Sequence, residues 1–189
     1  MAQEIEAKYR LDDPAGLRER LIACGAQRVT QVLEENRLFD TADRKLQTAD
    51  CGLRLRTRRA LDGGQPVSTT LTYKGPRAAG EIKTREELET ALTDPSASAT
   101  ILQRLGFAEV VAYEKRRETW QLDGCDVCLD ELPQLGWFVE IEGPSVATIE
   151  AVASKLGLHI EWLVRETYVE MAAAHGAPGV EGVRCLQFE

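Results

Sequence analysis

The chain has 189 residues, a length that suits one domain able to bury its core without disulfides or a structural metal. Hydrophobic residues make up 43% and charged residues 29%, as in globular proteins, and no window approaches the roughly eighteen consecutive apolar residues of a membrane span. The net charge of −8 argues against general binding to nucleic acid backbones, which needs a basic surface, so an anion would need a local cluster of cations.

Neither the N-terminus nor the cysteines indicate an exported protein. The opening sequence MAQEIEAKYR is charged from Glu4 onward and lacks the apolar stretch of a signal peptide, so we expect a cytoplasmic location. The five cysteines are odd in number and their spacing does not suggest a disulfide framework. Cys125 and Cys128 form a C-x-x-C, but no second pair or nearby histidine completes a zinc site, and on a strand the two thiols would point to opposite faces. We expect reduced thiols that pack within the fold.

Four segments carry the capping and stop residues of helices. In chain order, the predicted helices cover residues 13–25, 94–106, 145–157 and 161–174. The first begins with Asp13 and Pro14, which suit the N-cap and the first helical position, and it ends at Gly25. The fourth is expected to end near Gly176. Beyond Gly176 the sequence has no clear period, so we predict a single domain over residues 1–175 and a tail of unknown order over residues 176–189.

Most of the remaining segments alternate in character with period two, which is typical of strands. The predicted strands lie within residues 4–11, 53–58, 70–74, 82–89, 113–117, 126–130 and 139–142. Turn signals at residues 62–64, 75–76, 123–124 and 132–133 favour antiparallel hairpins. The predicted fold class is α+β, because no alternation of strands and helices with a glycine-rich phosphate loop is present. The apolar strand faces would pack against the helices.

Charged residues of both signs recur on one face of strand after strand. A single such face is ordinarily solvated, but the repetition predicts either an open charged surface or the inside of a closed barrel. Cations gathered in a lumen repel one another unless anions lie between them, and arginine forks fit phosphate oxygens. Carboxylates there would repel a polyphosphate unless hard divalent cations such as Mg²⁺ or Mn²⁺ bound both groups. The two-signed face therefore predicts a triphosphate-bearing small molecule together with metal.

The sequence resembles the CYTH superfamily, the triphosphate tunnel metalloenzymes. The resemblance begins with EIEAK at residues 4–8, which is similar to the E-x-E-x-K signature of that family. It continues through LRLR (53–56), TYKG (72–75), REELE (85–89), EKRRETW (114–120), LDELPQLGWFVEIEG (129–143) and RETY (165–168). The stretch at 129–143 is the most specific and resembles the branch that contains class IV adenylate cyclases. The resemblance implies an eight-stranded antiparallel closed β-barrel, or tunnel, with helices packed outside, and a homodimer.

The resemblance also implies roles for individual residues. The residues implied to bind the triphosphate are Lys8, Arg54, Arg56, Lys74, Arg85, Lys115 and Arg117, with Arg165 as a looser match. The residues implied to bind the metal are Glu4, Glu6, Glu87, Asp130, Glu140 and Glu142. Lys8, Lys74 and Glu6 are the candidate catalytic residues.

Three functions suit these residues. Water as the nucleophile would hydrolyse the terminal phosphate of tripolyphosphate, thiamine triphosphate or a nucleoside triphosphate. The 3′-hydroxyl of ATP as the nucleophile would give cyclic AMP and pyrophosphate instead, and a non-catalytic module would only bind polyphosphate or nucleotide. Hydrolysis is favoured because it requires only the tunnel residues, whereas a cyclase also needs base and ribose contacts. The acidic pairs count against a module that only binds.

Overall fold

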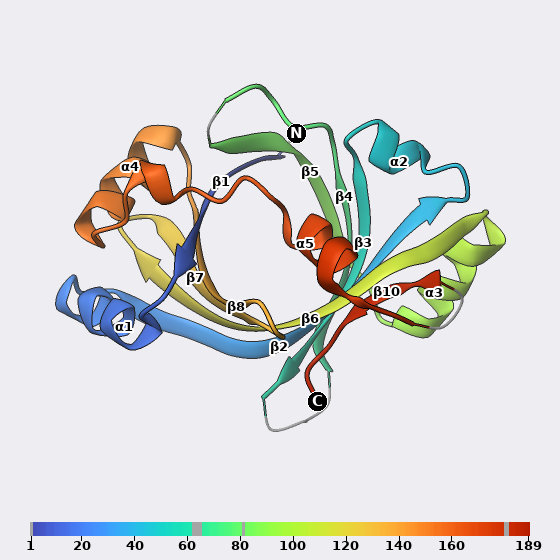
Figure 1. The fold of residues 1–189 in the computed structure, drawn as a ribbon, viewed down its shortest axis with the longest axis horizontal. Coiled ribbons are helices and arrows are strands. Elements are labelled where there is room, and N and C mark those ends of the chain that lie inside the picture. Colours follow the sequence, from blue (N-terminus) through green and yellow to red (C-terminus); the bar gives the residue numbers. More distant parts are fainter. Residues whose placement is uncertain (1, 62–65, 81, 180–181) are drawn as a thin grey trace.

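Strands form a closed ring in the computed structural model, which describes residues 2–61, 66–80, 82–179 and 182–189. The predicted turn at residues 62–64 lies outside this part of the chain. The strands are β1 (Ala2–Leu11), β2 (Gln27–Thr41), β3 (Gly52–Ala60), β4 (Pro66–Lys74), β5 (Lys83–Ala91), β6 (Phe107–Leu122), β7 (Cys125–Leu132) and β8 (Gly136–Glu142). Figure 1 shows them wrapped around a common interior.

The ring follows the order β2-β3-β4-β5-β1-β8-β7-β6, and β6 pairs again with β2. Every neighbouring pair in this ring is antiparallel. The first strand lies between β5 and β8, with Glu4 opposite Arg85 and Lys8 opposite Glu140. The predicted α+β class and the closed antiparallel barrel are therefore confirmed.

Helices pack around this barrel and against one of its ends. They are α1 (Pro14–Ala23), α2 (Lys45–Thr48), α3 (Pro95–Arg104), α4 (Val146–Lys155) and α5 (Tyr168–His175). The predicted N-caps are confirmed, because the side chains of Asp13, Asp94 and Ser145 each accept a hydrogen bond from a backbone N–H of the first turn. Figure 1 shows α1 and α4 at one end of the molecule and α3 at the other. No helix in the described part of the chain is long and apolar enough to cross a membrane.

The predicted fourth helix over residues 161–174 is wrong in its first half. A short 3₁₀ turn spans Ile160–Trp162, and α5 begins only at Tyr168. Between them lies an extended segment, residues 163–167, which we call the strap. Leu163 forms an isolated antiparallel bridge with Tyr9, and the Val164 N–H donates to the Lys8 carbonyl at 2.8 Å. These bonds satisfy the edge of β1 beyond its pairing with β5, and they hold the strap out of a helix.

Further elements were not predicted from the sequence. They are strand β2, helix α2 and two short strands in the tail, β9 (Ala177–Pro178) and β10 (Arg184–Leu186). β10 pairs in parallel with β6, opposite Val111 to Tyr113. Its Leu186 is 1% exposed and packs against α5 and the barrel. The tail therefore has ordered segments in the same sheet, while the division at residue 175 stays a prediction.

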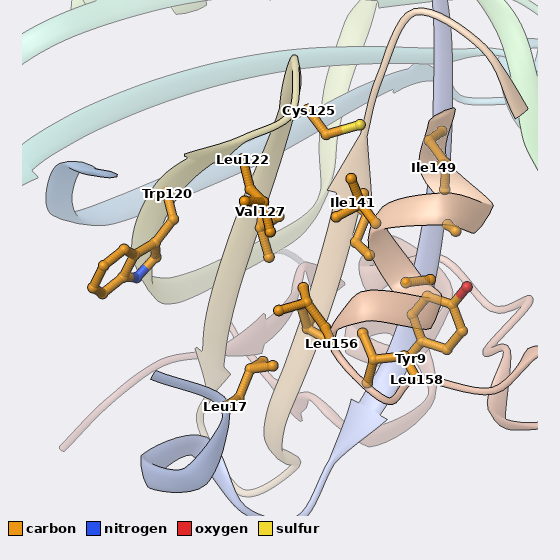
Figure 2. Close-up of a cluster of buried hydrophobic side chains, with 14 of the residues drawn as sticks. Tyr9, Leu17, Trp120, Leu122, Cys125, Val127, Ile141, Ile149, Leu156 and Leu158 are labelled. Carbon is orange, nitrogen blue, oxygen red and sulfur yellow. The ribbon is translucent and has the colours of Figure 1, made fainter. Parts of the chain in front are cut away.

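The largest hydrophobic cluster fills the space between α1, α4 and the outward faces of β1, β7 and β8. Figure 2 shows Leu17, Val127, Ile141, Ile149 and Leu156 converging there from helices and strands. Alternation places apolar residues of these strands in this cluster and leaves the charged residues between them to the interior.

The cysteines follow the same alternation. Cys125 belongs to the hydrophobic cluster, whereas Cys128 lies on the interior face beside Thr119, with the two side-chain atoms 3.7 Å apart. All five thiols are free. Burial raises the pKa of the Cys128 thiol to about 11. Cys125 and Cys128 are therefore buried on opposite faces of β7, as predicted, whereas Cys24 is exposed and does not pack within the fold.

Candidate functional site

The barrel interior collects charged residues from all eight strands of the ring, most of them predicted from the sequence. One group lies where β1, β4 and β5 meet. Lys74 Nζ contacts the carboxylate of Glu4 and lies 2.8 Å from Glu87 Oε2. Arg85 Nε donates to Glu4 Oε2 at 3.2 Å. All four residues are predicted site residues, and the structure brings them together.

A neighbouring pair extends this group along β1 and β5. Lys83 Nζ lies 3.4 Å from Glu6 Oε1, and both side chains are about nine-tenths buried. Lys83 was not among the predicted phosphate-binding residues. The signal was present in the sequence, because Lys83 precedes Arg85 by two residues and so shares its face.

A second group lies deeper, on β1, β6, β7 and β8. Lys115 Nζ lies 3.1 Å from Asp130 Oδ2, and Arg117 Nε donates to Asp130 Oδ1 at 2.6 Å. Glu140 contacts Arg117 and lies 3.6 Å from Lys8 Nζ. Burial opposes the charge of Glu140, but Lys115, Arg117 and Lys8 together hold its pKa well below the usual range. The structure thus places two predicted metal ligands, Asp130 and Glu140, among cations.

A third group centres on Glu34 of β2, which sequence reasoning missed. Its carboxylate is fully buried and lies 2.9 Å from Arg58 Nε, 3.3 Å from Arg56 Nη1 and 3.4 Å from Lys115 Nζ. Burial opposes its charge, yet Arg56 and Lys115 hold the pKa of Glu34 well below its usual range. Arg56 Nε also donates to Asn36 Oδ1 at 2.8 Å. Glu34 therefore fixes the positions of cations that are predicted to bind phosphate.

Arg54 shows that the interior has capacity for an anion. Its Nη2 donates to Thr72 Oγ1 at 3.3 Å, and the charge of Glu89 lies 3.9 Å away. Within the described residues its buried Nε–H has no hydrogen-bond acceptor. Burial and the charge of Arg56 lower its pKa. A buried guanidinium N–H without an acceptor is costly, and a phosphate oxygen would satisfy it.

Carboxylates around Glu142 have the donor chemistry of a divalent-metal site. Burial, followed by the charges of Glu4, Glu6 and Glu87, raises the pKa of Glu142 to about 7. Carboxylate oxygens that repel one another in this way suit Mg²⁺ or Mn²⁺. Within the described residues no three acidic, histidine or cysteine side chains already surround one point. Glu4, Glu6 and Glu87 instead contact Lys74, Lys83 and Arg85, so metal binding requires these side chains to turn.

Helix α5 closes the end of the barrel beyond the second group. Tyr168 enters from its first turn and packs against Tyr113 and Phe138, with ring centroids 6.5 and 5.6 Å away. Its hydroxyl donates to Asp130 Oδ2 at 2.9 Å, and Lys8 Nζ lies 3.8 Å above its ring. Burial and the charge of Asp130 raise the Tyr168 pKa well above its usual value.

Lys8 is held between this closed end and the strap. Its side chain is about 99% buried, and Nζ donates to the Glu166 carbonyl at 2.8 Å. Burial lowers the pKa of Lys8 to about 8, although Glu140 partly offsets that effect. The strap also carries Arg165, which lies at an exposed position beside the barrel rather than inside it.

We expect the Tyr168→Phe substitution to lower the free energy of unfolding by about 2 kcal/mol, because it removes a buried hydrogen bond to a charged carboxylate. The ring, and with it the packing on Phe138, is kept. Urea denaturation of the two proteins measures the difference. Tyr73→Phe is the control, because the Tyr73 hydroxyl lies 3.3 Å from the weakly polar thiol of Cys51. Equal stability of Tyr168→Phe and the unsubstituted protein would contradict the expectation.

A model of the CYTH domain family matches residues 2–157, from the first strand to two residues beyond α4. The chain belongs to the CYTH domain family. A CYTH relative from Methanocaldococcus jannaschii, named "Putative adenylate cyclase", is 29% identical over 178 residues, which cover 89% of this chain and 97% of the relative. The matched region contains every predicted site residue except Arg165.

Solved structures share the CYTH fold of this chain. A protein of Pyrococcus horikoshii is 29% identical with a TM-score of 0.78, over 89% of this chain and 97% of that one. A protein of Hippeastrum, described as having a dominant triphosphatase activity, is 21% identical with a TM-score of 0.62, over 82% of this chain and 88% of that one. The Hippeastrum likeness shows the fold alone. As a member of this family the chain is a triphosphate-processing enzyme of the metal-dependent tunnel type.

Proposed function

We propose that the protein is a Mg²⁺- or Mn²⁺-dependent hydrolase that removes the terminal phosphate of tripolyphosphate, thiamine triphosphate or a nucleoside triphosphate. One observation carries the proposal: the predicted phosphate-binding cations are paired, inside one barrel, with the predicted metal-binding carboxylates. Lys74 with Glu4 and Arg117 with Glu140 are examples. A triphosphate with its metal carries both charges. Its phosphate oxygens can replace the carboxylate beside each cation, and the metal can replace the cation beside each carboxylate.

This exchange, in which phosphate and metal replace the ion-pair partners of the interior side chains, leaves every buried charge with a partner. A buried charge that loses its partner is destabilising. When phosphate oxygens take Lys74 and Arg85, the released carboxylate of Glu4 needs a new cation. Glu4, Glu6, Glu87 and Glu142 would hold a divalent metal ion in that role. Binding of substrate and metal is then mutually dependent on electrostatic grounds.

The residues of the chain divide into three roles. Arg54, Arg56 and Arg85 bind and orient the phosphate oxygens. Lys8 and Lys74 lie nearer the carboxylates and place positive charge where charge develops on the transferred phosphate. A bound Mg²⁺ or Mn²⁺ supplies charge neutralisation and activation of the nucleophile.

Two further residues hold the phosphate-binding cations in position. Glu34 positions Arg56 and Lys115, and Asp130 positions Lys115 and Arg117. Both act through the cations that they hold. We assign Asp130 to this role because its two oxygens are bonded to cations and to the Tyr168 hydroxyl. Metal binding by Asp130 stays a prediction.

Cyclisation of ATP is the second candidate, and the name of the Methanocaldococcus jannaschii relative favours it. It uses the same tunnel and metal but needs the 3′-hydroxyl of the ribose to reach the α-phosphorus. The Hippeastrum protein is an example of hydrolysis on this fold. We favour hydrolysis, because the residues described above are sufficient for it.

Incubation of the purified protein with tripolyphosphate, thiamine triphosphate or ATP, with Mg²⁺ or Mn²⁺, tests the proposal. We expect release of orthophosphate from at least one substrate and its loss when EDTA removes the metal. Cyclic AMP and pyrophosphate from ATP would establish the cyclase instead. Absence of turnover with every triphosphate would leave a binding module. The homodimer and the cytoplasmic location stay predictions.

A further inference from the structure

A side cavity opens through the barrel wall next to Lys8. It has a volume of about 230 Å³ and lies between the loop at residues 77–80, which joins β4 and β5, and the strap. The register explains the gap. Pairing of β5 with β1 ends at Lys83 opposite Glu6, and the strap takes over only at Lys8 and Tyr9. The wall is therefore interrupted beside Ala7.

Several positively charged residues line the cavity, and some of them have no role in the proposed hydrolysis. Lys8 and Lys83 reach it from the barrel interior, Arg77 lines it from the loop, and Arg165 lines it from the strap. Glu6 is the acidic residue in the described lining. At about 30 Å³ for each water molecule, the volume holds several waters or one small anion.

The outer rim of the cavity is held in place by ion pairs. Arg77 Nη2 lies 2.7 Å from Asp50 Oδ1 and 3.3 Å from Glu170 Oε1, so it ties the loop both to the segment after α2 and to α5. Ala78 N–H donates to the Thr84 carbonyl at 2.8 Å, which fixes the base of the loop. The opening is thus part of the folded structure, and its exposed side chains at Ala78 and Ala79 are small.

The barrel offers a cleaved phosphate ion few ways out. Tyr168, Phe138 and Met171 fill the end of the barrel beyond Lys8 with apolar side chains. A phosphate ion set free beside Lys8 cannot leave along the axis in that direction. A triphosphate or diphosphate that still occupies the tunnel blocks the other direction. The side cavity also reaches Lys8, and it lies to the side of the barrel axis.

We propose that the side cavity is a subsite for inorganic phosphate through which the cleaved phosphate leaves the barrel. The inference rests on the proposed hydrolysis for its role in turnover, while its affinity for phosphate can be tested without catalysis. Lys8 and Lys83 would pass the anion to Arg77 and Arg165 at the rim. No bond is made or broken in this step.

The Ala79→Asp substitution tests the route, because it places a negative charge at an exposed position in the lining. Total phosphate formed is measured by rapid quenching, and phosphate free in solution is measured with a fluorescent phosphate-binding protein. We expect the first turnover to form phosphate at an unchanged rate and the release to slow about tenfold, the effect of 1.4 kcal/mol. Ala97→Asp, on the exposed start of α3, adds the same charge elsewhere and is expected to change neither rate. Unchanged release in Ala79→Asp would overturn the route.

Binding of orthophosphate provides a readout that does not depend on activity. Phosphate is titrated into the EDTA-treated protein, and backbone amide shifts are followed by NMR. We expect saturable shifts at Ala78, Gly80 and Val164, with an apparent affinity about tenfold weaker in Ala79→Asp than in Ala97→Asp. Shifts confined to residues of the barrel interior would overturn the subsite. If the unsubstituted protein releases no phosphate from any triphosphate, the proposed hydrolysis fails, and this titration still decides the subsite.

Discussion

Replacing Glu34 by glutamine is expected to lower the free energy of unfolding by about 3 kcal/mol, the lower end of the cost of removing one partner from a buried ion cluster. The carboxylate is fully buried and is shared by Arg56, Arg58 and Lys115, so its loss leaves like charges facing one another. Urea denaturation at neutral pH, without phosphate or metal, measures the loss.

The same substitution is expected to tighten the binding of tripolyphosphate. In EDTA, the cations that Glu34 neutralises become available to the ligand, and we expect an affinity gain of about tenfold, or 1.4 kcal/mol. Isothermal titration calorimetry measures this change. A residue with only a structural role would give the destabilisation without the gain in affinity.

Glu118→Gln is the matched control for Glu34→Gln. Glu118 is also a buried glutamate of a long strand, with Arg18 Nε at 3.0 Å and Trp120 Nε1 at 2.8 Å, but it faces the outside of the barrel. We expect its loss to destabilise the protein without changing the affinity for tripolyphosphate. If Glu34→Gln binds tripolyphosphate no more tightly than Glu118→Gln, the charge of Glu34 does not weaken the binding of tripolyphosphate.

The double substitution Glu4→Gln and Glu6→Gln is expected to reduce metal-dependent turnover at least about 100-fold, the upper range for losing a residue that merely supports a metal ligand. The amides keep the size of the side chains but not the charge that a divalent cation needs. Turnover is measured while Mn²⁺ is titrated, so that weaker metal binding can be separated from a lower maximal rate.

Triphosphate affinity in EDTA distinguishes metal binding from a structural role. Lys74, Lys83 and Arg85 lose their carboxylate partners in the double variant and stay available to phosphate. We therefore expect the affinity for tripolyphosphate in EDTA to be at least as high as in the unsubstituted protein, for the same reason as in Glu34→Gln. Glu150→Gln with Glu161→Gln, at two exposed positions, is the control for the lost charge. A parallel loss of affinity in EDTA would show that Glu4 and Glu6 serve to shape the phosphate site.

The sequence predicted the interior face of β1 because its charges alternate without interruption. Glu4, Glu6 and Lys8 share one parity, and the residues between them are apolar. Repetition of that pattern over several strands left two alternatives, an open charged surface or a closed barrel, and the family resemblance implied the barrel. What the pattern leaves undetermined is the register, which places Glu4 opposite Arg85 and Lys8 opposite Glu140. Cross-strand partners depend on turn lengths and bulges, so the pairing of individual charges came only from the structure.

Strand β2 escaped prediction because both of its faces carry charge. Glu34 faces the interior, whereas the adjacent Glu35 pairs with Arg59 on the other face, with 2.8 Å between Glu35 Oε1 and Arg59 Nε. A register shift between Leu38 and Phe39 interrupts the period further. The spacing of Glu34 and Asn36, two residues apart, was the one local signal that matched the other interior pairs.

The start of α5 could have been read from the sequence. Thr167 and Glu170 form a capping box, in which each side chain bonds the other residue's backbone N–H. This T-x-x-E spacing is a known signature of a helix N-terminus. The segment before it has helical composition, but its backbone bonds go to β1, more than a hundred residues away in sequence. Such long-range competition is invisible to local propensity.

The placement of β1 between β5 and β8 has a consequence for the nascent chain. Residue 6 pairs with residue 142, so during synthesis β1 has no complete set of neighbours until β8 has also been made. During that interval Glu4, Glu6 and Lys8 remain hydrated on an unpaired segment, and their charge keeps that segment soluble and hinders its premature pairing with other chains. The alternating charges that line the interior of the finished barrel thus also protect β1 from aggregation during synthesis.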